Sequence, residues 1–150
     1  MTKTKLSIAT VLLLSGFASA AFPQQSSDQP MDVAPTPLPT QCGQAEGASA
    51  GHAMPGMAGI DMSGMDEAQK ANMAAMMKMH PAMMQGMMAK DPDVAFACGM
   101  IAHHQGAIDM AEVELKYGDN NEAKKMAQMI IDAQTKEIGE FKQWLEANAK

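Results

Sequence analysis

Methionine takes the place that leucine holds in most helical proteins. After residue 20 the chain has 17 Met and only three Leu, and twelve of the Met fall between Met54 and Met88. The two side chains have similar volume and helix propensity, so either can build a helical core. Methionine adds a polarizable thioether, which is a soft ligand for Cu(I). The composition therefore predicts helices, whose Met form either a core or a metal-binding surface.

The first 20 residues have the pattern of a secretory signal peptide. Lys3 and Lys5 give a basic start, residues 6–17 form a short apolar run, and Ala18-Ser19-Ala20 fits a small-residue cleavage site. The run is too short and wrongly flanked for a membrane span, although a retained anchor is the alternative. We therefore expect a periplasmic or secreted protein without membrane contact after cleavage.

The chain after residue 20 is long enough for one domain and is acidic. Nine Lys, no Arg and 17 Asp plus Glu leave it a formal charge of −8. This balance argues against nucleic acid and anionic lipid as partners and favours a cation. In an oxidising compartment, Cys42 and Cys98 could form a disulfide, which would contribute about 4 kcal/mol by closing a long loop. The alternative is two unpaired thiols, one or both binding metal.

Residues 21–64 predict a flexible arm, since they are rich in Pro, Gly, Ser, Gln and Ala and lack apolar periodicity. The arm contains His52 and two copies of Met-x-Gly-Met. The Met of these copies are Met54, Met57, Met62 and Met65. Nothing nearby in the arm could bury them, so metal ligation explains them better than packing does.

Residues 65–150 predict a helical-bundle domain. Asp66 and Gln69 resemble a capping box that opens a first helix. Pro81 either kinks this helix or starts a second short one that ends near Ala89.

Two longer helices follow. Asp91 before Pro92 predicts a helix start, and Gly118 predicts its end after Tyr117. The last helix starts at residue 119 or 120 and runs to about residue 148. Short links between long helices imply antiparallel neighbours, so we expect an all-α, ferritin-like up-down bundle of three to four helices.

Eight Met and His side chains, the Met stripe, recur on one side of the first helical segment. At 100° per residue they fall within an arc of about 140°. Such spacing is typical of a core face, but His80 among them favours a mixed Met and His metal site. Ala74, Lys78 and Gln85 on the other side are expected to be exposed. The stripe consists of Met73, Met76, Met77, His80, Met83, Met84, Met87 and Met88.

The next helix carries two adjacent histidines. His103 shares a face with Met100 and Met110, and with Phe96 and Ala107. His104 is turned 100° away, so one ion cannot easily bind both from a regular helix. We expect His103 to be a ligand. His104 is a ligand of another ion, a residue that orients a ligand, or a core residue.

The last helix places Met126 and Met129 on the apolar face that continues to Phe141 and Trp144. These two Met could complete a metal site begun on the preceding helix. Glu137 lies on the same face and would need a partner if buried. A hydrogen bond from His103 or His104 would supply it and fix the imidazole tautomer.

The segment Met100-Ile101-Ala102-His103-His104-Gln105-Gly106-Ala107-Ile108-Asp109-Met110-Ala111 resembles the signature of the CopM-like family of exported bacterial Met/His-rich copper-binding proteins. The similarity continues to Leu145 and covers residues 91–145. It implies a ferritin-like four-helix arrangement and a role in copper binding and resistance. It also implies that Met100, His103, His104 and Met110 are functional. Ala102 departs from the family, where Pro is common, and Phe141 departs where Met is common, which removes one thioether.

These observations predict an exported protein that binds Cu(I), with Ag(I) as a mimic and Cu(II) as a secondary ion. Thioethers persist in an oxidising space and need no deprotonation to bind metal. The role would be copper resistance, buffering or delivery, with another exported copper protein or a transporter as a candidate partner. The chain lacks Glu-x-x-His, Gly-x-Ser-x-Gly, Cys-x-x-Cys and a phosphate loop, which argues against an enzyme. The alternative is a Met-rich interaction or oxidant-scavenging module.

Overall fold

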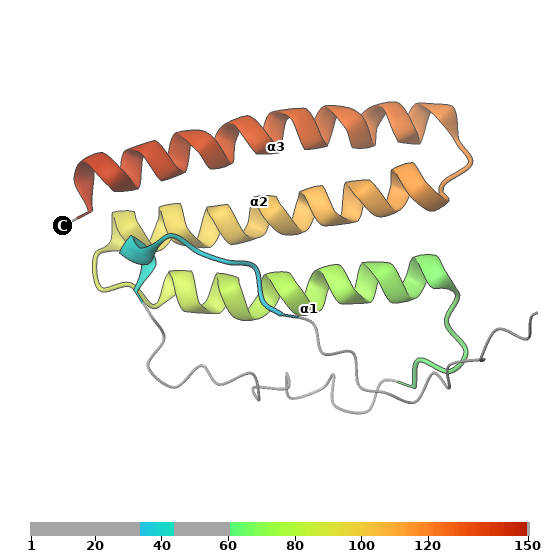
Figure 1. Ribbon diagram of the computed structural model, residues 1–150, viewed down its shortest axis with the longest axis horizontal. Coiled ribbons are helices and arrows are strands. Elements are labelled where there is room, and N and C mark those ends of the chain that lie inside the picture. Colours follow the sequence, from blue (N-terminus) through green and yellow to red (C-terminus); the bar gives the residue numbers. More distant parts are fainter. Residues whose placement is uncertain (1–33, 44–60, 150) are drawn as a thin grey trace, which may run out of the picture.

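The computed structural model describes residues 34–43 and 61–149. Within these ranges the chain forms three long helices and one 3₁₀ helix, and no strand. They are η1 (Thr40–Cys42), α1 (Glu67–Met87), α2 (Pro92–Tyr117) and α3 (Asn121–Asn148). Figure 1 shows the long helices side by side, with α2 in the middle and short turns between them. The predicted all-α, up-down architecture is confirmed, with three helices in the described part of the chain.

Polar side chains start all three helices, as the sequence predicts. The Asp66 carboxylate accepts from the Gln69 N–H at 2.8 Å, and the Gln69 side chain accepts from the Asp66 N–H at 2.9 Å. Asp91 caps α2 ahead of Pro92, and Asn120 caps α3. Each cap gives a partner to backbone N–H groups that a helix start leaves free, so the boundaries are set locally.

Residues 34–43, named the strap here, lie against α1 and α2 (Figure 1). A disulfide joins Cys42 to Cys98 on α2, with the two Cα atoms 5.6 Å apart. The Thr36 N–H donates to the Lys78 carbonyl at 3.2 Å, and Gln85 Nε2 donates to the Gly43 carbonyl at 2.8 Å. The predicted disulfide is confirmed. The strap lies inside the range predicted as flexible arm, and these bonds hold it without apolar periodicity.

α1 is continuous through Pro81, so of the two alternatives the single helix is found. Pro81 has no N–H to give to the Met77 carbonyl one turn earlier. The hydrogen bond from Thr36 falls on the next carbonyl, that of Lys78. The strap therefore supports α1 where its own hydrogen-bond ladder is weakest.

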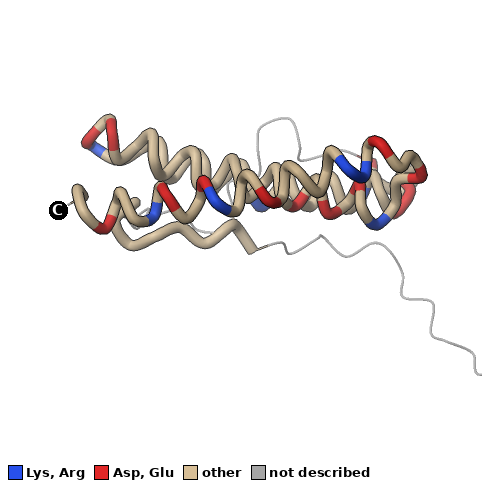
Figure 2. The backbone as a smooth tube through the Cα atoms, turned by 90° about the horizontal axis from the view of Figure 1, so that it is seen from above, with Lys and Arg blue, Asp and Glu red and all other residues tan. Residues whose placement is uncertain are grey.

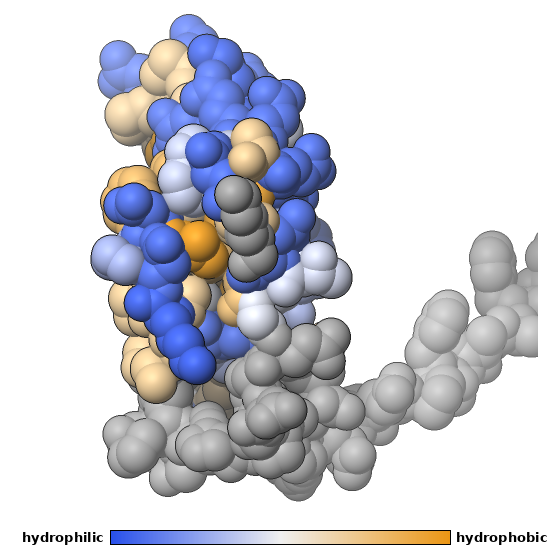
Figure 3. Space-filling view, turned by 90° about the vertical axis from the view of Figure 1, so that its left-hand side faces the viewer, coloured by the Kyte–Doolittle hydropathy of each residue, from blue (hydrophilic) through white to orange (hydrophobic). Residues whose placement is uncertain are grey.

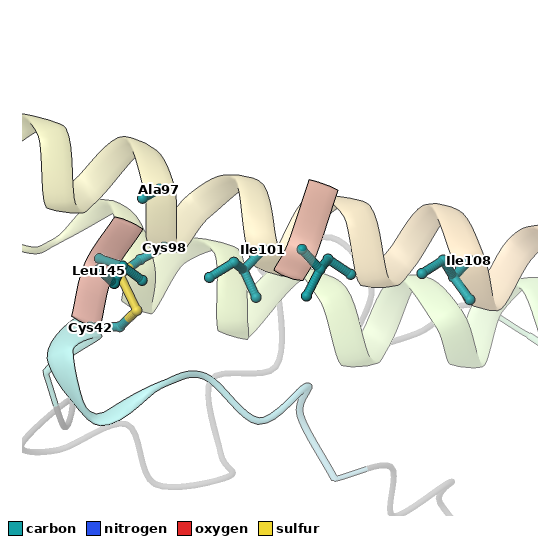
Figure 4. Packing of buried hydrophobic residues seen from close by; sticks show 7 residues of the cluster. Cys42, Ala97, Cys98, Ile101, Ile108 and Leu145 are labelled. Carbon is teal, nitrogen blue, oxygen red and sulfur yellow. A yellow bond between two sulfur atoms is a disulfide. The ribbon is translucent and has the colours of Figure 1, made fainter. Parts of the chain in front are cut away.

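The core is built from Ala, Ile, Leu and the disulfide. Ile101, Leu145 and Cys98 are the largest fully buried side chains. Figure 4 shows Leu145 beside the Cys42–Cys98 bond, with Ile101 and Ile108 further along α2. No Met of the described residues is buried. Methionine therefore does not take the place of leucine in this core.

α1 packs on α2 through small residues. Ala75, Ala82 and Gly86 are buried on the side of α1 that faces α2. A Cβ added at Gly86 would lie 2.7 Å from the carbonyl carbon of Cys98 and 2.8 Å from the Gly99 nitrogen. These are backbone atoms, so glycine at this position allows the two helices to approach closely.

The three helices form a layer rather than a closed bundle. α2 packs against both neighbours, and α1 and α3 lie on its two sides (Figure 1). Acidic and basic residues are both scattered along the helices, with long uncharged stretches between them (Figure 2). The strap covers one face of α2 through Cys98, and the helical spacing puts Phe96, Met100 and His103 on the opposite face. That opposite side of α2 and α3, which no described helix covers, is named the open face.

Candidate functional site

No member of the Met stripe is buried in the contact between α1 and α2. Met76, Met84, Met87 and Met88 are exposed, and the other four members are half-buried. The stripe is therefore not a buried core face, which its spacing allowed, but a partly exposed surface. Met79, which lies outside the stripe, meets Gly106 of α2, and within the stripe Met87 lies next to Gly99 of α2. The thioethers of the stripe remain accessible.

The face opposite the stripe also differs from expectation. Ala74, Lys78 and Gln85 were predicted to be exposed, yet all three are half-buried, and the strap forms hydrogen bonds with Lys78 and Gln85. Lys78 Nζ also lies 3.7 Å from Asp109 Oδ2 of α2. The strap is a covering element that the helical periodicity of α1 could not indicate.

The two adjacent histidines have different surroundings. His103 is exposed, whereas His104 is only 5% exposed. His104 Nε2 lies 2.7 Å from Glu137 Oε2, which confirms the predicted partnership of a histidine with this carboxylate. Since a carboxylate only accepts, Nε2 carries a proton. In the neutral imidazole His104 Nδ1 then keeps a lone pair, and this buried atom has no partner among the described residues. A carboxylate that orients an imidazole in this way is typical of metal-binding histidines, and it holds His104 in place more firmly than the exposed His103.

The soft residues of α2 and α3 lie on the open face. Met110 is exposed on α2, and Met126 and Met129 are exposed on α3. Counting back from the turn between the helices, Met110 is level with Met126 and Met129. These three Met are thus at one end of the open face, and Met100 and His104 are toward the other. They do not gather with the Met stripe, which lies on α1.

A cleft of about 840 Å³ lies between the first half of α2 and the second half of α3. Met100 and His104 line it, together with aromatic and acidic side chains. It opens near the end of the molecule where α2 begins and α3 ends. In the view onto that end, apolar surface appears among hydrophilic residues (Figure 3). The lining residues are Asp93, Phe96, Ala97, Met100, His104, Glu137, Glu140, Phe141 and Trp144.

The candidate ligands of the arm are only partly within the described ranges. The predicted signal peptide, His52, Met54 and Met57 lie outside them. Met62 and Met65 are half-buried just before α1, where the Met65 N–H donates to the Met62 carbonyl at 3.1 Å. The second Met-x-Gly-Met copy is thus a turn that leads into α1.

No three His, Cys, Asp or Glu side chains converge among the described residues. A zinc-like or di-iron-like site of nitrogen and oxygen ligands is therefore not formed in this part of the chain. Any soft-metal site there has to use thioethers.

Sequence reasoning missed the cleft and the contact between α1 and α2. Phe96, Phe141 and Trp144 looked like ordinary members of apolar faces, and only the pairing of α2 with α3 brings them together. The α1 contact did have a signal, since Ala75, Met79, Ala82 and Gly86 recur at helical spacing. Met dominates the neighbouring face, so the small residues give the weaker of the two patterns in the sequence.

A comparison with protein families matches residues 20–145 to the family described as Domain of unknown function (DUF305). The match covers most of the chain, and the protein belongs to this family. A search of curated proteins found no match. Among the described residues, no helix has both the length and the apolarity to cross a bilayer.

Proposed function

We propose that this is an exported copper-binding protein that takes up Cu(I) through accessible Met thioethers and His imidazoles. Ag(I) would bind as a mimic, and Cu(II) would be secondary. The observation that carries the proposal is that no described Met is buried, although the chain has few other large apolar residues to place in its core. A methionine that replaced leucine for packing alone would lie in the interior.

The chemistry of the thioether supports the ion. Cu(I) is soft and prefers sulfur and imidazole, and a thioether stays neutral and available in an oxidising space. The Cys42–Cys98 disulfide fits that compartment and removes the thiols as competing ligands. Two regions are the best candidates, namely the Met stripe with His80 and the pair Met100 and His104 with Glu137 behind it. Copper is the cargo, for resistance, buffering or delivery to another exported copper protein or a transporter, and we assign no catalytic role.

Native mass spectrometry with Ag(I), and with Cu(I) under conditions that keep the disulfide intact, tests the proposal. We expect several bound ions at micromolar metal. Changing Met76, Met83, Met84 and Met87 to Leu should lower the number, because Leu keeps volume and apolarity but has no sulfur.

Met79→Leu is the matched control, since Met79 packs on Gly106 outside the stripe. It should leave the ion count unchanged. Binding of no metal by the wild-type protein, or an unchanged count in the stripe variant, would sink the proposal. The same change at Met54 and Met57 measures the share of the arm.

The open face favours one alternative, a Met-rich surface that binds apolar partners or absorbs oxidant. Phe96 is 60% exposed and Met129 62% exposed, and apolar side chains that gather on one face can mark a surface that binds partners. Apolar contacts do not need sulfur, so stripe Met→Leu variants would keep partner binding, whereas they would lose reactivity with oxidant together with metal binding. If the wild-type protein bound an apolar partner or reacted with peroxide but bound no metal, that result would favour this alternative.

A further inference from the structure

The cleft between α2 and α3 has walls of aromatic rings. Phe96, Phe141 and Trp144 line it, and the rings of Phe96 and Phe141 meet edge to face with centroids 5.7 Å apart. Phe96 is 60% exposed and Trp144 is 37% exposed. Rings that stand at the rim of a cleft of about 840 Å³, instead of in the core, offer their faces to a ligand.

The charges of the cleft have one sign. Asp93, Glu137 and Glu140 line it, and no Lys or Arg does. Lys136 pairs with Glu140 at 3.3 Å, but both side chains of that pair are largely exposed to water. Carboxylates beside aromatic faces repel anions and attract cations, since the face of a ring carries partial negative charge.

His104 adds an unsatisfied acceptor to the same cleft. It is 5% exposed, its Nε2–H is committed to Glu137, and its Nδ1 has no partner. A buried lone pair without a donor costs free energy. Because His104 is one of the lining residues, a ligand with an N–H group could supply the missing donor.

We propose that this cleft binds a small organic ammonium ion that carries an apolar chain. The ammonium group is neutralised by the carboxylates and lies against the ring faces, and one N–H donates to His104 Nδ1. The chain packs on Phe96, Trp144 and Met100. A single metal ion would leave most of the volume and all three rings unused. The cleft includes Met100 and His104, the second candidate copper pair, but no residue of the Met stripe, so copper can bind the stripe whether or not the cleft binds an ammonium ion.

Fluorescence of Trp144 reports directly on the cleft, since it is the only Trp of the chain. The full protein with its disulfide, in an amine-free buffer without added metal, is titrated with pentylammonium, with 1-pentanol and with pentyltrimethylammonium. We expect a saturable change with pentylammonium and binding at least about tenfold weaker for the neutral alcohol. The trimethyl compound, which has no N–H, should bind more weakly than pentylammonium.

Two variants test whether pentylammonium binds in the cleft. Phe96→Leu and Glu140→Gln change exposed residues of the cleft and should each weaken pentylammonium by about threefold. Met129→Leu, on α3 but outside the cleft, should not. Far-UV circular dichroism verifies that all three fold.

No saturable change with pentylammonium, or equal affinity for 1-pentanol, overturns the proposal. Equal affinity for the trimethyl compound overturns the part assigned to His104.

Discussion

Replacing Gly86 by Ala should destabilise the protein by about 2 kcal/mol, whereas the same change at Gly139 should stabilise it by about 1 kcal/mol. Both glycines lie inside helices, α1 and α3 respectively. An added Cβ at Gly86 would meet the backbone of Cys98 and Gly99 at 2.7 to 2.9 Å, where no side chain can move aside. At Gly139 it would meet nothing within 4 Å.

The magnitudes follow from two opposing terms. Alanine gains about 1 kcal/mol over glycine in a helix interior, and this gain applies at both positions. Overpacking against rigid backbone costs about 3 kcal/mol at the upper end of its usual range, and this cost applies only at Gly86. The two variants should therefore differ by about 3 kcal/mol, which corresponds to melting temperatures about 15 °C apart for a domain of this size.

Urea unfolding followed by circular dichroism at 222 nm measures both variants against the wild type. A neutral or stabilising effect of Gly86→Ala would refute the close approach of α1 and α2. A loss of stability in Gly139→Ala would show that α3 is covered at a position where the structure leaves open space for a Cβ.

Three further changes test local features by the same unfolding measurement. Glu137→Leu leaves the Nε2–H of His104 without its acceptor and should lower the free energy of unfolding by about 2 kcal/mol. Glu137→Gln keeps an acceptor and should cost clearly less. Equal losses in the two variants would contradict the hydrogen bond. Asp91→Ala removes the acceptor of the Asp93 and Val94 N–H groups and should cost about 1 kcal/mol, so an unchanged midpoint would argue against this cap. Changing both Cys42 and Cys98 to Ser should lower the free energy of unfolding by about 4 kcal/mol. Reduction of the wild-type disulfide should give the same loss. If it does not, the loss in the variant comes from changed packing and not from the missing bond.

The helix boundaries could be predicted from sequence because their determinants are local. Asp66, Asp91 and Asn120 each satisfy N–H groups two or three residues ahead, so a short stretch of sequence contains the whole interaction. Pro81 was ambiguous for the opposite reason. Whether a helix continues through proline depends on packing from elsewhere, here from the strap.

The role of each face could not be predicted in the same way. Periodicity tells which residues share a face, but it does not tell what covers that face. Met76 and Met84 had the spacing of a core, yet Ala75 and Ala82, on the neighbouring side of α1, make the contact. The choice between His103 and His104 likewise depended on where α3 lies, because the two residues are only 100° apart.

The Cys42–Cys98 bond has a topological consequence. The covalent loop that it closes contains all twelve Met between Met54 and Met88. A single cut in the backbone of this loop divides the chain but not the molecule, because the two fragments stay joined through sulfur. A protease must therefore cut twice, or a reductant must act first, before the Met-rich half can separate from α2 and α3.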